Sequence, residues 1–238
     1  MRREIHKTEY VGLGKIMAWN IVKSEGGVPR IAVCIPHTGE VNMEWVHTAY
    51  GPLIFKESTW CVKHSFLCRG PPIDLAREDV VNQALEWKAD YIFFLDSDVI
   101  PEIPSDINSM LYKLYKRDLP IVSGMYRTKK VGNPWAMWTF VDKDTGFKNI
   151  NEWNSDLLEV DVTGLGCCLI KTEVFDKIEK PWFRWDLKYA PSEDFYFLLK
   201  AKAEGKYKVI VDTTIKCSHI GTVKILPGVI PAYRPPQI

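Results

Sequence analysis

Two carboxylates separated by one residue follow an apolar run in the first half of the sequence. Asp96 and Asp98 come directly after Tyr91 to Leu95, a continuous apolar stretch that is typical of a buried strand. Mg²⁺ and Mn²⁺ prefer oxygen ligands, and a diphosphate leaving group needs such a cation while its bond breaks. A solvated turn, in which aspartates bond their own backbone, would give the same pattern. The pair therefore indicates a candidate site for a cation and phosphates. Other residues must decide between such a site and a solvated turn.

A second acidic pair, Glu193 and Asp194, stands at the predicted start of a helix, directly after Ser192. The unpaired N–H groups and the dipole of a helix N-terminus favour the ionised carboxylate. An ionised Asp194 could accept a hydroxyl proton as a general base. Glu193, one position earlier, should point about 100° away around the helix and so should not share that role. Simple charge complementarity at a helix start explains the same two residues without any catalysis.

His219 follows a predicted strand and is the histidine best placed to join Asp98 at a cation site. Imidazole is an accepted ligand of Mn²⁺, although oxygen donors dominate among its ligands. The alternative is a structural histidine that hydrogen-bonds the backbone at a strand end. Of the other histidines, only His37 stands at a strand exit that would face the same crevice.

The elements that must position these residues predict an α/β fold. Apolar runs of strand length alternate with amphipathic helical patterns, which indicates a mixed, mostly parallel sheet flanked by helices. One helix should start with Asp74 as its N-cap. Ligands of such sheets bind beyond the carboxyl ends of the strands, where Asp96 and Asp98 fall. The predicted strands are 31–35, 60–67, 91–95, 121–123, 135–141, 157–162, 167–170, 207–211 and 215–218, and the predicted helices are 41–50, 74–88, 105–115, 172–178 and 193–203.

The length of 238 residues suits one compact domain. We expect this domain over residues 30–222. An N-terminal extension over 1–29 and a Pro- and Gly-rich C-terminal tail over 223–238 should flank it.

The composition excludes several classes of protein. Lys and Arg total 31 against 30 Asp and Glu, so the net charge of +1 lacks the basic excess of a nucleic-acid binder. The six cysteines show no C-x-x-C pair and no zinc spacing, which predicts reduced core residues in a cytoplasmic protein. No apolar run approaches the ~18 residues that span a bilayer. We therefore expect a cytoplasmic protein without a transmembrane segment, with contact to a membrane surface left open.

These features and several further segments, taken in their order, resemble the GT-A glycosyltransferases of the family-2-like type. The resemblance covers about residues 30 to 222. It depends on the order and spacing of the segments and not on any single motif. It implies a single GT-A (Rossmann-like) domain. The segments are IAVCIP at 31–36, AR at 76–77, ADYIFFLDSD at 89–98, VSGMYR at 122–127, VTGLGCCLI at 162–170, SED at 192–194 and HIG at 219–221.

The resemblance implies roles for the acidic residues and for His219. Asp98 and His219 would bind Mn²⁺ or Mg²⁺. Asp96 would bind the same cation, or contact the donor ribose or a metal-bound water. Asp194 would deprotonate the acceptor hydroxyl, which implies inversion at the anomeric carbon. A retaining mechanism stays open.

The resemblance also implies contacts with the nucleotide and the sugar. Pro36 and His37 would line the nucleotide pocket. Arg77 would help to hold the diphosphate, unless it is an exposed helix charge. Gly164 and Gly166 would let the backbone approach the sugar closely, with a simple tight turn as the alternative.

The second predicted strand departs from the family pattern. Many family members carry an acid at its end that reads a uracil ring. Lys63-His64-Ser65-Phe66 carries none, so a uridine donor is not supported.

Aromatic residues are a further feature of this sequence, which has 9 Trp. In the run 181–185, Trp182 and Trp185 could stack on an acceptor sugar, or they could plug the edge of the sheet. Alternation along their strand favours core positions for Trp135 and Trp138.

The sequence therefore favours a metal-dependent glycosyltransferase that moves a sugar from a nucleotide-diphosphate donor to a hydroxyl of a glycan, lipid or protein acceptor. Paired carboxylates with a histidine would also suit a metal-dependent nucleotidyl or phosphoryl transferase. A non-catalytic sugar-binding module on the same fold is the third hypothesis. No nucleic-acid partner is expected.

Overall fold

The computed structural model describes residues 27–70, 72–102, 107–130, 132–185 and 190–221. The predicted extension over 1–29, apart from 27–29, and the predicted tail over 223–238 lie outside these residues, as does the predicted helix cap Ser105. The domain boundaries therefore stay predictions.

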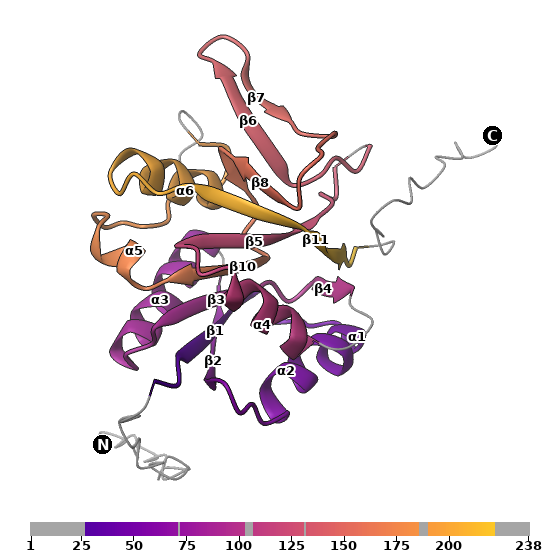
Figure 1. The fold of residues 1–238 in the computed structure, drawn as a ribbon, viewed down its shortest axis with the longest axis vertical. Coiled ribbons are helices and arrows are strands. Elements are labelled where there is room, and N and C mark those ends of the chain that lie inside the picture. Colours follow the sequence, from indigo (N-terminus) through magenta and orange to yellow (C-terminus); the bar gives the residue numbers. More distant parts are fainter. Residues whose placement is uncertain (1–26, 71, 103–106, 131, 186–189, 222–238) are drawn as a thin grey trace, which may run out of the picture.

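An eight-stranded sheet forms the centre of the protein (Figure 1). Its strands follow the order β2-β1-β3-β10-β5-β11-β4, and β8 pairs with the first half of β11. Strands β1, β2, β3, β5 and β11 run in one direction and β10, β4 and β8 in the other, so the prediction of a mixed, mostly parallel sheet is confirmed. The bounds are β1 Arg30–His37, β2 Val62–Arg69, β3 Tyr91–Leu95, β4 Val99–Glu102, β5 Ile121–Tyr126, β8 Leu157–Val160, β10 Cys167–Lys171 and β11 Val209–His219.

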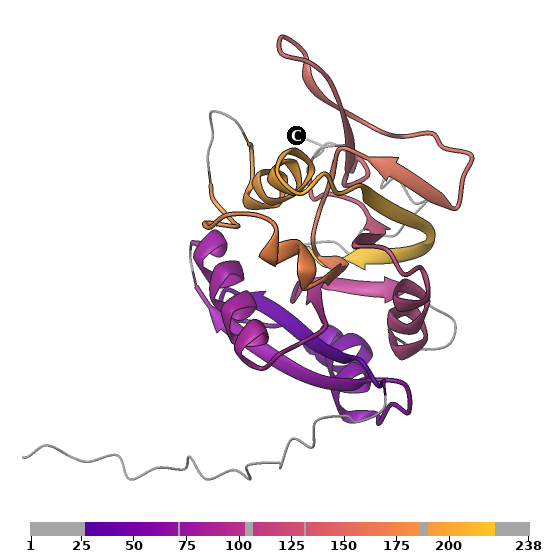
Figure 2. The same ribbon diagram turned by 60° about the vertical axis from the view of Figure 1, so that its left-hand side comes forward.

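Helices cover both faces of this sheet (Figures 1 and 2). Strand β1 shows why, because Ile31, Val33 and Ile35 face one core and Ala32 and Cys34 the other, all fully buried. A strand that is buried on both faces has to be apolar at every position, as the sequence indicated. The core of Ala32 is closed by α3 (Ile73–Glu86), α5 (Glu173–Asp176) and α6 (Glu193–Ala203), and the core of Ile31 by α1 (Met43–Trp45), η1 (Val46–Tyr50), α2 (Gly51–Phe55) and α4 (Ile107–Lys116).

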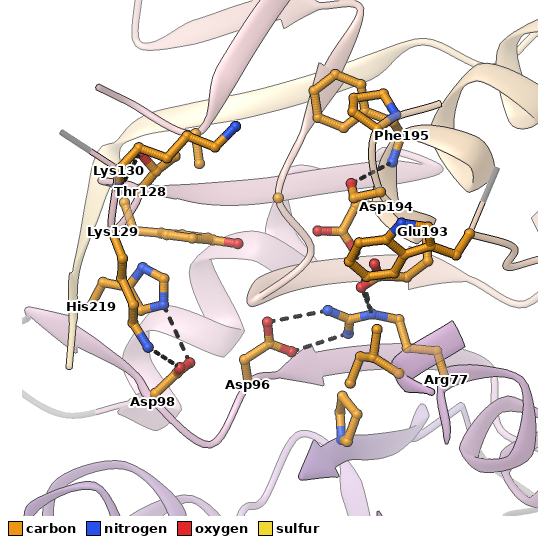
Figure 3. A pocket seen from close by; sticks show the side chains of 18 of the residues that line it. Arg77, Asp96, Asp98, Thr128, Lys129, Lys130, Glu193, Asp194, Phe195 and His219 are labelled. Atoms are coloured by element: carbon orange, nitrogen blue, oxygen red, sulfur yellow. Dashed lines mark hydrogen bonds and ion pairs between the residues drawn. The ribbon is translucent and has the colours of Figure 1, made fainter. Parts of the chain in front are cut away.

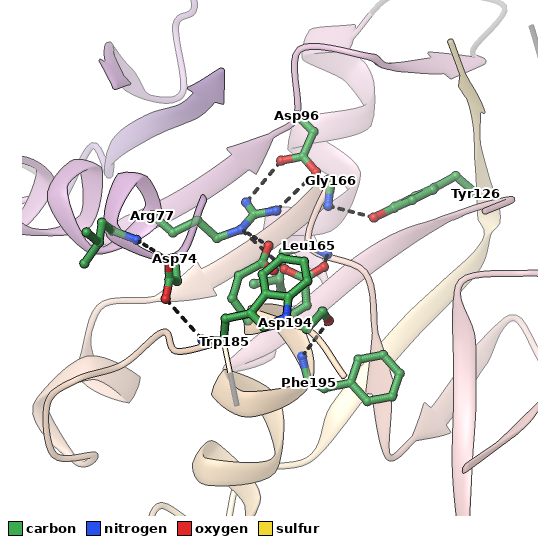
Figure 4. Close-up of polar contacts among 12 residues, drawn as sticks. Asp74, Arg77, Asp96, Tyr126, Leu165, Gly166, Trp185, Asp194 and Phe195 are labelled. Atoms are coloured by element: carbon green, nitrogen blue, oxygen red, sulfur yellow. Dashed lines mark hydrogen bonds and ion pairs between the residues drawn. The ribbon is translucent and has the colours of Figure 1, made fainter. Parts of the chain in front are cut away.

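Helix α3 begins at Ile73, with Pro72 in extended backbone as its N-cap. The prediction of Asp74 as the cap is wrong, because the helix starts before it and Asp74 lies in the first turn. The Asp74 carboxylate accepts hydrogen bonds from the backbone N–H of Leu75 (3.0 Å) and of Trp185 (3.1 Å; Figure 4). Asp74 thereby ties the segment that ends at Trp185 to the start of α3.

Two strands were not predicted from the sequence. β4 follows Asp98 directly and contains Pro101, which is tolerated because β4 lies at the edge of the sheet. β7 (Gly146–Asn149) pairs with β6 (Met137–Asp142), which also pairs with β9 (Val162–Thr163), and these three strands form a second, smaller sheet. The β6–β7 hairpin projects from the body of the protein at the top of Figure 1.

Strand β11 is continuous where the sequence predicted two strands. Its pairing with β5 shifts register between Asp212 and Lys216, so the strand pairs with β8 before the shift and with β4 after it. Asp212 is fully buried at this irregularity and accepts hydrogen bonds from Arg117 Nε (2.8 Å) and from the backbone N–H of Thr214 (3.0 Å). A buried carboxylate without partners would destabilise the fold, and these hydrogen bonds provide the partners that Asp212 needs.

The shared direction of β1, β3, β5 and β11 determines where a ligand can bind. Their carboxyl ends meet at one edge of the sheet, which brings together His37, Asp96, Tyr126 and His219. This edge is the position at which open α/β sheets bind their ligands.

None of the helices in the described part of the chain has the length and apolar character that crossing a membrane requires. All six cysteines are free, and all but the half-buried Cys68 are buried, so the prediction of core positions is confirmed for five of them.

Candidate active site

A cavity of about 930 Å³ opens at the carboxyl edge of the sheet (Figure 3). It brings together residues that are up to 183 positions apart in the sequence (His219 minus Pro36). Gly166 alone among the predicted site residues does not line it. The predicted site residues in its wall are Pro36, His37, Arg77, Asp96, Asp98, Gly164, Asp194 and His219.

Arg77 lies at the centre of a buried cluster of three carboxylates (Figures 3 and 4). Its two terminal nitrogens face both oxygens of Asp96, at 3.1 Å and 3.2 Å. Its Nε donates to Glu193 Oε1 at 3.1 Å and lies 3.3 Å from Asp194 Oδ1. Only 2% of the side chain is exposed, so the alternative of an exposed helix charge is wrong. The guanidinium links α3 to the end of β3 and the start of α6; a contact with a diphosphate stays a prediction.

Glu193 and Asp194 converge on the same guanidinium. The expectation that Glu193 points away from Asp194 is therefore wrong: the longer Glu193 side chain reaches around the first turn of α6. Burial raises the pKa of Asp194 well above its usual range, and the Glu193 carboxylate raises it further, against the lowering effect of Arg77. The expectation that the helix N-terminus keeps Asp194 ionised thus neglected burial, whose effect on the pKa has the opposite sign.

The oxygens of Asp194 differ in their partners. Oδ2 accepts a hydrogen bond from the backbone N–H of Leu165 (3.3 Å). Oδ1 is buried and accepts no hydrogen bond from the described residues, although it lies within ion-pair distance of Arg77. A buried carboxylate oxygen without a donor is uncommon in folded proteins, and here it belongs to a residue that lines a cavity.

Asp98 turns away from this cluster toward two basic side chains (Figure 3). Lys129 Nζ lies 2.5 Å from Asp98 Oδ2, and His219 Nε2 lies 3.5 Å from Asp98 Oδ1. Partial burial would raise the pKa of Asp98, but the hydrogen bonds and charges of His219 and Lys129 lower it to about 2. Asp98 is therefore ionised throughout the physiological range of pH.

Hydrogen bonding fixes the orientation of the His219 ring. Its Nδ1 lies 2.9 Å from the carbonyl oxygen of Arg127, and because a carbonyl can only accept, Nδ1 carries the proton. The other ring nitrogen, Nε2, faces Asp98 Oδ1 at 3.5 Å, and in the neutral ring it is the nitrogen whose lone pair would be available to a cation. This orientation is typical of metal-binding histidines, whose second ring nitrogen is held by a carbonyl or carboxylate.

Asp96, Asp98 and His219 do not form a prearranged three-ligand site. Within the described residues, no group of three or more His, Cys, Asp or Glu side chains is placed to hold a metal ion. The reason is that the two carboxylates of the pair diverge, Asp96 to Arg77 and Asp98 to Lys129 and His219. Asp98 and His219 fit as two ligands of a cation, whose remaining positions would fall to water or substrate oxygens, as is common for Mg²⁺.

His37 and Pro36 line the cavity at the end of β1, beside Thr38 and Ile73. Nδ1 of His37 accepts a hydrogen bond from the backbone N–H of Gly39 at 3.1 Å. The other ring nitrogen therefore carries the proton and is available as a donor. The nucleotide contact predicted for His37 and Pro36 is not tested by this arrangement.

Gly164 and Gly166 make room for the phenol of Tyr126. A Cβ on Gly164 would lie 2.0 Å from the Tyr126 hydroxyl oxygen. A Cβ on Gly166 would lie 2.8 Å from Val99 Cγ2, 3.0 Å from the Tyr126 hydroxyl oxygen and 3.1 Å from Asp96 Oδ2. The backbone N–H of Gly166 donates to the Tyr126 hydroxyl at 3.0 Å (Figure 4). The close approach is therefore to Tyr126 at Gly164 and to both Val99 and Tyr126 at Gly166, and an approach to a sugar stays a prediction.

We expect Gly164→Ala to destabilise the protein by about 1–3 kcal/mol, because the new methyl group must displace a buried aromatic ring. In a protein of this size that corresponds to a fall in Tm of roughly 2–4 °C per kcal/mol. Thermal unfolding of purified variants measures it. Gly70→Ala is the matched control, since the nearest atom to its Cβ is 3.8 Å away. Equal stability of the two variants would contradict the assignment.

The aromatic run 181–185 divides between two functions. Trp182 and Phe183 are buried in the core beneath α6, so they are packing residues. Trp185 is half exposed and lines the cavity. Trp138, which alternation placed in the core, also lines the cavity, and its ring packs on Phe195 at 5.0 Å. Trp135 is buried as expected.

The cavity wall contains polar residues that the sequence analysis missed, among them Tyr126, Lys129 and Lys130. Tyr126 lies in the segment 122–127 and ends strand β5, so a search for polar groups at strand ends could have found it. The two lysines follow only a few residues later, and a basic pair near a strand end was the available signal.

Comparison with known proteins identifies the fold. No protein-family model matches this chain, and no curated protein matches it. The crystal structure of A197 from STIV aligns over 87% of this chain and 98% of its own, at 22% identity and a TM-score of 0.56. This chain shares its fold with A197. The apo form of a UDP-glucose pyrophosphorylase aligns over 80% of this chain and 91% of its own at 7% identity, and its TM-score of 0.44 is too low to establish a common fold. The family-2 resemblance gains no separate support from these comparisons.

Proposed function

We propose that this protein is a metal-dependent glycosyltransferase that moves a sugar from a nucleotide-diphosphate donor to a hydroxyl acceptor. One observation carries the proposal: a single cavity contains an acid–histidine pair suited to a cation, Asp98 and His219, and a separate buried carboxylate, Asp194, whose Oδ1 accepts no hydrogen bond from the described residues. Glycosyl transfer needs both, because one partner must stabilise the leaving diphosphate and another must remove the proton of the attacking hydroxyl.

The leaving-group end of the site would be formed by Asp98 and His219 with Mn²⁺ or Mg²⁺. When bound, the cation would neutralise the charge that develops on the diphosphate. The position already attracts positive charge, since the ammonium group of Lys129 contacts Asp98. Asp96, fixed by its bidentate contact with Arg77, would contact the donor ribose or a metal-bound water.

The acceptor end would be formed by Asp194. The acceptor hydroxyl would attack the anomeric carbon while its proton passes to Asp194, and the bond from that carbon to the diphosphate oxygen would break with its electron pair on the oxygen. This single displacement inverts the anomeric configuration. A carboxylate whose pKa is raised by burial is a stronger base than an ordinary one, which suits this step. Trp185, half exposed at the cavity, offers the acceptor an aromatic face.

The products distinguish this function from the alternatives. The full chain is incubated with a panel of nucleotide-diphosphate sugars and Mn²⁺, and the nucleotide products are separated by chromatography. Release of nucleoside diphosphate supports glycosyl transfer. Release of pyrophosphate or sugar phosphate would indicate a nucleotidyl or phosphoryl transferase instead, and binding without release would indicate a sugar-binding module.

We expect turnover to be lost in excess chelator and restored by Mn²⁺ or Mg²⁺. Asp98→Asn should remove most of the affinity for the donor and leave stability nearly unchanged, because Asp98 lies on a partly exposed strand end. Titration calorimetry with the nucleotide sugar, in parallel with thermal unfolding, measures both effects. Full activity in excess chelator would exclude the assigned cation site.

A further inference from the structure

Lys129 places a tethered positive charge at the proposed cation site. Its Nζ contacts Asp98 Oδ2 at 2.5 Å, and both side chains are partly exposed at the cavity, 43% and 37% respectively. The neighbouring Lys130 also lines the cavity, but it makes no ion pair with a described residue. Figure 3 shows the Lys129 ammonium and His219 on the same side of Asp98. Asp98 therefore already has the partner that a divalent cation would have to replace.

The backbone beside Lys129 is anchored, whereas its side chain is long and flexible. The backbone N–H of Thr128 donates to the Pro134 carbonyl at 2.8 Å, and Arg127 Nη1 donates to the Asn133 carbonyl at 2.7 Å. The Arg127 guanidinium also stacks over Trp135 at 4.1 Å. A lysine on such a base can move its ammonium group within the cavity while its backbone stays in place.

The buried guanidinium of Arg77 cannot take over this contact. Arg77 already forms ion pairs with Asp96, Glu193 and Asp194. Its guanidinium therefore does not neutralise Asp98 as well. A divalent cation and an ammonium group on the same carboxylate would repel each other strongly at this distance. Binding of a divalent cation beside His219 therefore weakens the contact between Lys129 and Asp98.

We propose that Lys129 is an exchangeable cation of this site: it occupies Asp98 in the free protein, gives way when a divalent cation binds, and then pairs with the diphosphate of the donor. The second part rests on the proposed function, since it requires a diphosphate in the same cavity. Lys129 would thus be a further catalytic residue that contacts the leaving group, and it would delay firm binding of the metal until the donor is present.

The first test measures metal binding without any turnover. Mn²⁺ is titrated into the full chain and free Mn²⁺ is followed by electron paramagnetic resonance. We expect Lys129→Met to bind Mn²⁺ about three- to tenfold more tightly than the natural protein, because a competing, partly exposed ion pair is removed. Lys130→Met, which removes an equal charge without a contact to Asp98, should change the affinity less than twofold. Equal or weaker Mn²⁺ binding by Lys129→Met would overturn the exchange.

The second test measures the transferred contact. Inorganic pyrophosphate, which needs no matching base or sugar, is titrated calorimetrically in saturating Mn²⁺. Lys129→Met should bind pyrophosphate about five- to tenfold more weakly, whereas Lys129→Arg should retain most of the affinity. Lys129→Met should thus bind Mn²⁺ more tightly and pyrophosphate more weakly. A general disturbance of the structure would not change the two affinities in opposite directions. Unchanged pyrophosphate affinity in Lys129→Met would overturn the role at the diphosphate.

A double substitution separates this inference from the proposed function. In the background of Asp98→Asn, Lys129→Met should no longer improve Mn²⁺ binding, because the contact being exchanged is already absent. A persistent gain would show that Lys129 acts by general charge and would overturn the exchange. If the metal and pyrophosphate tests succeed but no nucleotide sugar is turned over, the proposed function fails and the exchange stands.

Discussion

Replacing Asp194 with asparagine should lower kcat for glycosyl transfer by about 10² to 10⁴-fold, the contribution expected of a positioned general base. Asparagine has nearly the same shape, so the backbone bond from Leu165 can persist, but the amide cannot accept the acceptor's proton. The Asp194 side chain belongs to the Arg77 cluster and lies apart from the Asp98–His219 pair (Figure 3), so donor affinity should stay within about threefold. Initial rates at saturating donor and acceptor, together with calorimetric donor binding, measure the two quantities.

Glu193→Gln is the matched control, because it changes the adjacent carboxylate of the same cluster. We expect a smaller fall in kcat, since Glu193 is not the residue that accepts the proton. It affects the reaction only through the Arg77 guanidinium, which it shares with Asp194. If the two substitutions lower kcat equally, or if Asp194→Asn affects donor affinity alone, Asp194 is not the base. A retaining mechanism would then be favoured.

The pH profile gives a second signature of the same base. Burial and the Glu193 carboxylate both raise the pKa of Asp194, and the base works only when it is deprotonated. The acidic limb of kcat/KM should therefore lie above the value of about 4 that an ordinary aspartate would give. Glu193→Gln removes one of the effects that raise the pKa of Asp194 and should move this limb toward lower pH. A limb that moves toward higher pH would contradict the assigned coupling.

Replacing Arg77 with methionine should destabilise the fold by about 3–5 kcal/mol, the cost of removing one partner from a buried ionic cluster. The substitution leaves Asp96, Glu193 and Asp194 close together with no positive charge among them. Urea unfolding measures the loss. Arg69→Met is the control, because Arg69 is exposed on β2 and its replacement should change stability by no more than about 0.5 kcal/mol.

A compensating substitution tests whether charge is the cause. Arg77→Met combined with Glu193→Gln leaves one fewer buried carboxylate and should recover part of the lost stability. If the double variant is as unstable as the sum of its two single variants, the loss comes from packing rather than from unpaired charge. Glycosyl transfer should stay impaired in the double variant, because Asp96 and Asp194 no longer share an anchor.

Much of the architecture could be predicted from local pattern. Apolar runs gave β1, β3, β5 and β10, and the period of three to four residues gave α3 and α6, because burial of one face or two leaves a direct signature in the order of residues. Strand direction then places His37, Asp96 and His219 at one edge, which is why most of the predicted site residues line one cavity. Edge strand β4 and hairpin strand β7 carry weaker patterns, since edges and hairpins bury less apolar surface.

The pairing of the charges was decided only by the tertiary structure. The sequence placed Asp96 and Asp98 together, but Asp96 pairs with Arg77 from α3 and Asp98 with Lys129 from beyond β5. Glu193 joins Asp194 because its longer side chain reaches the same guanidinium. Local sequence fixes which element a side chain belongs to and roughly which way it leaves the backbone, whereas its partner depends on which distant elements the strand order brings within about 3–4 Å. For that reason the sequence alone indicated a polar site at the carboxyl edge of an α/β sheet, and the folded chain determined which cation neutralises each carboxylate and which oxygen of Asp194 accepts no hydrogen bond from the described residues.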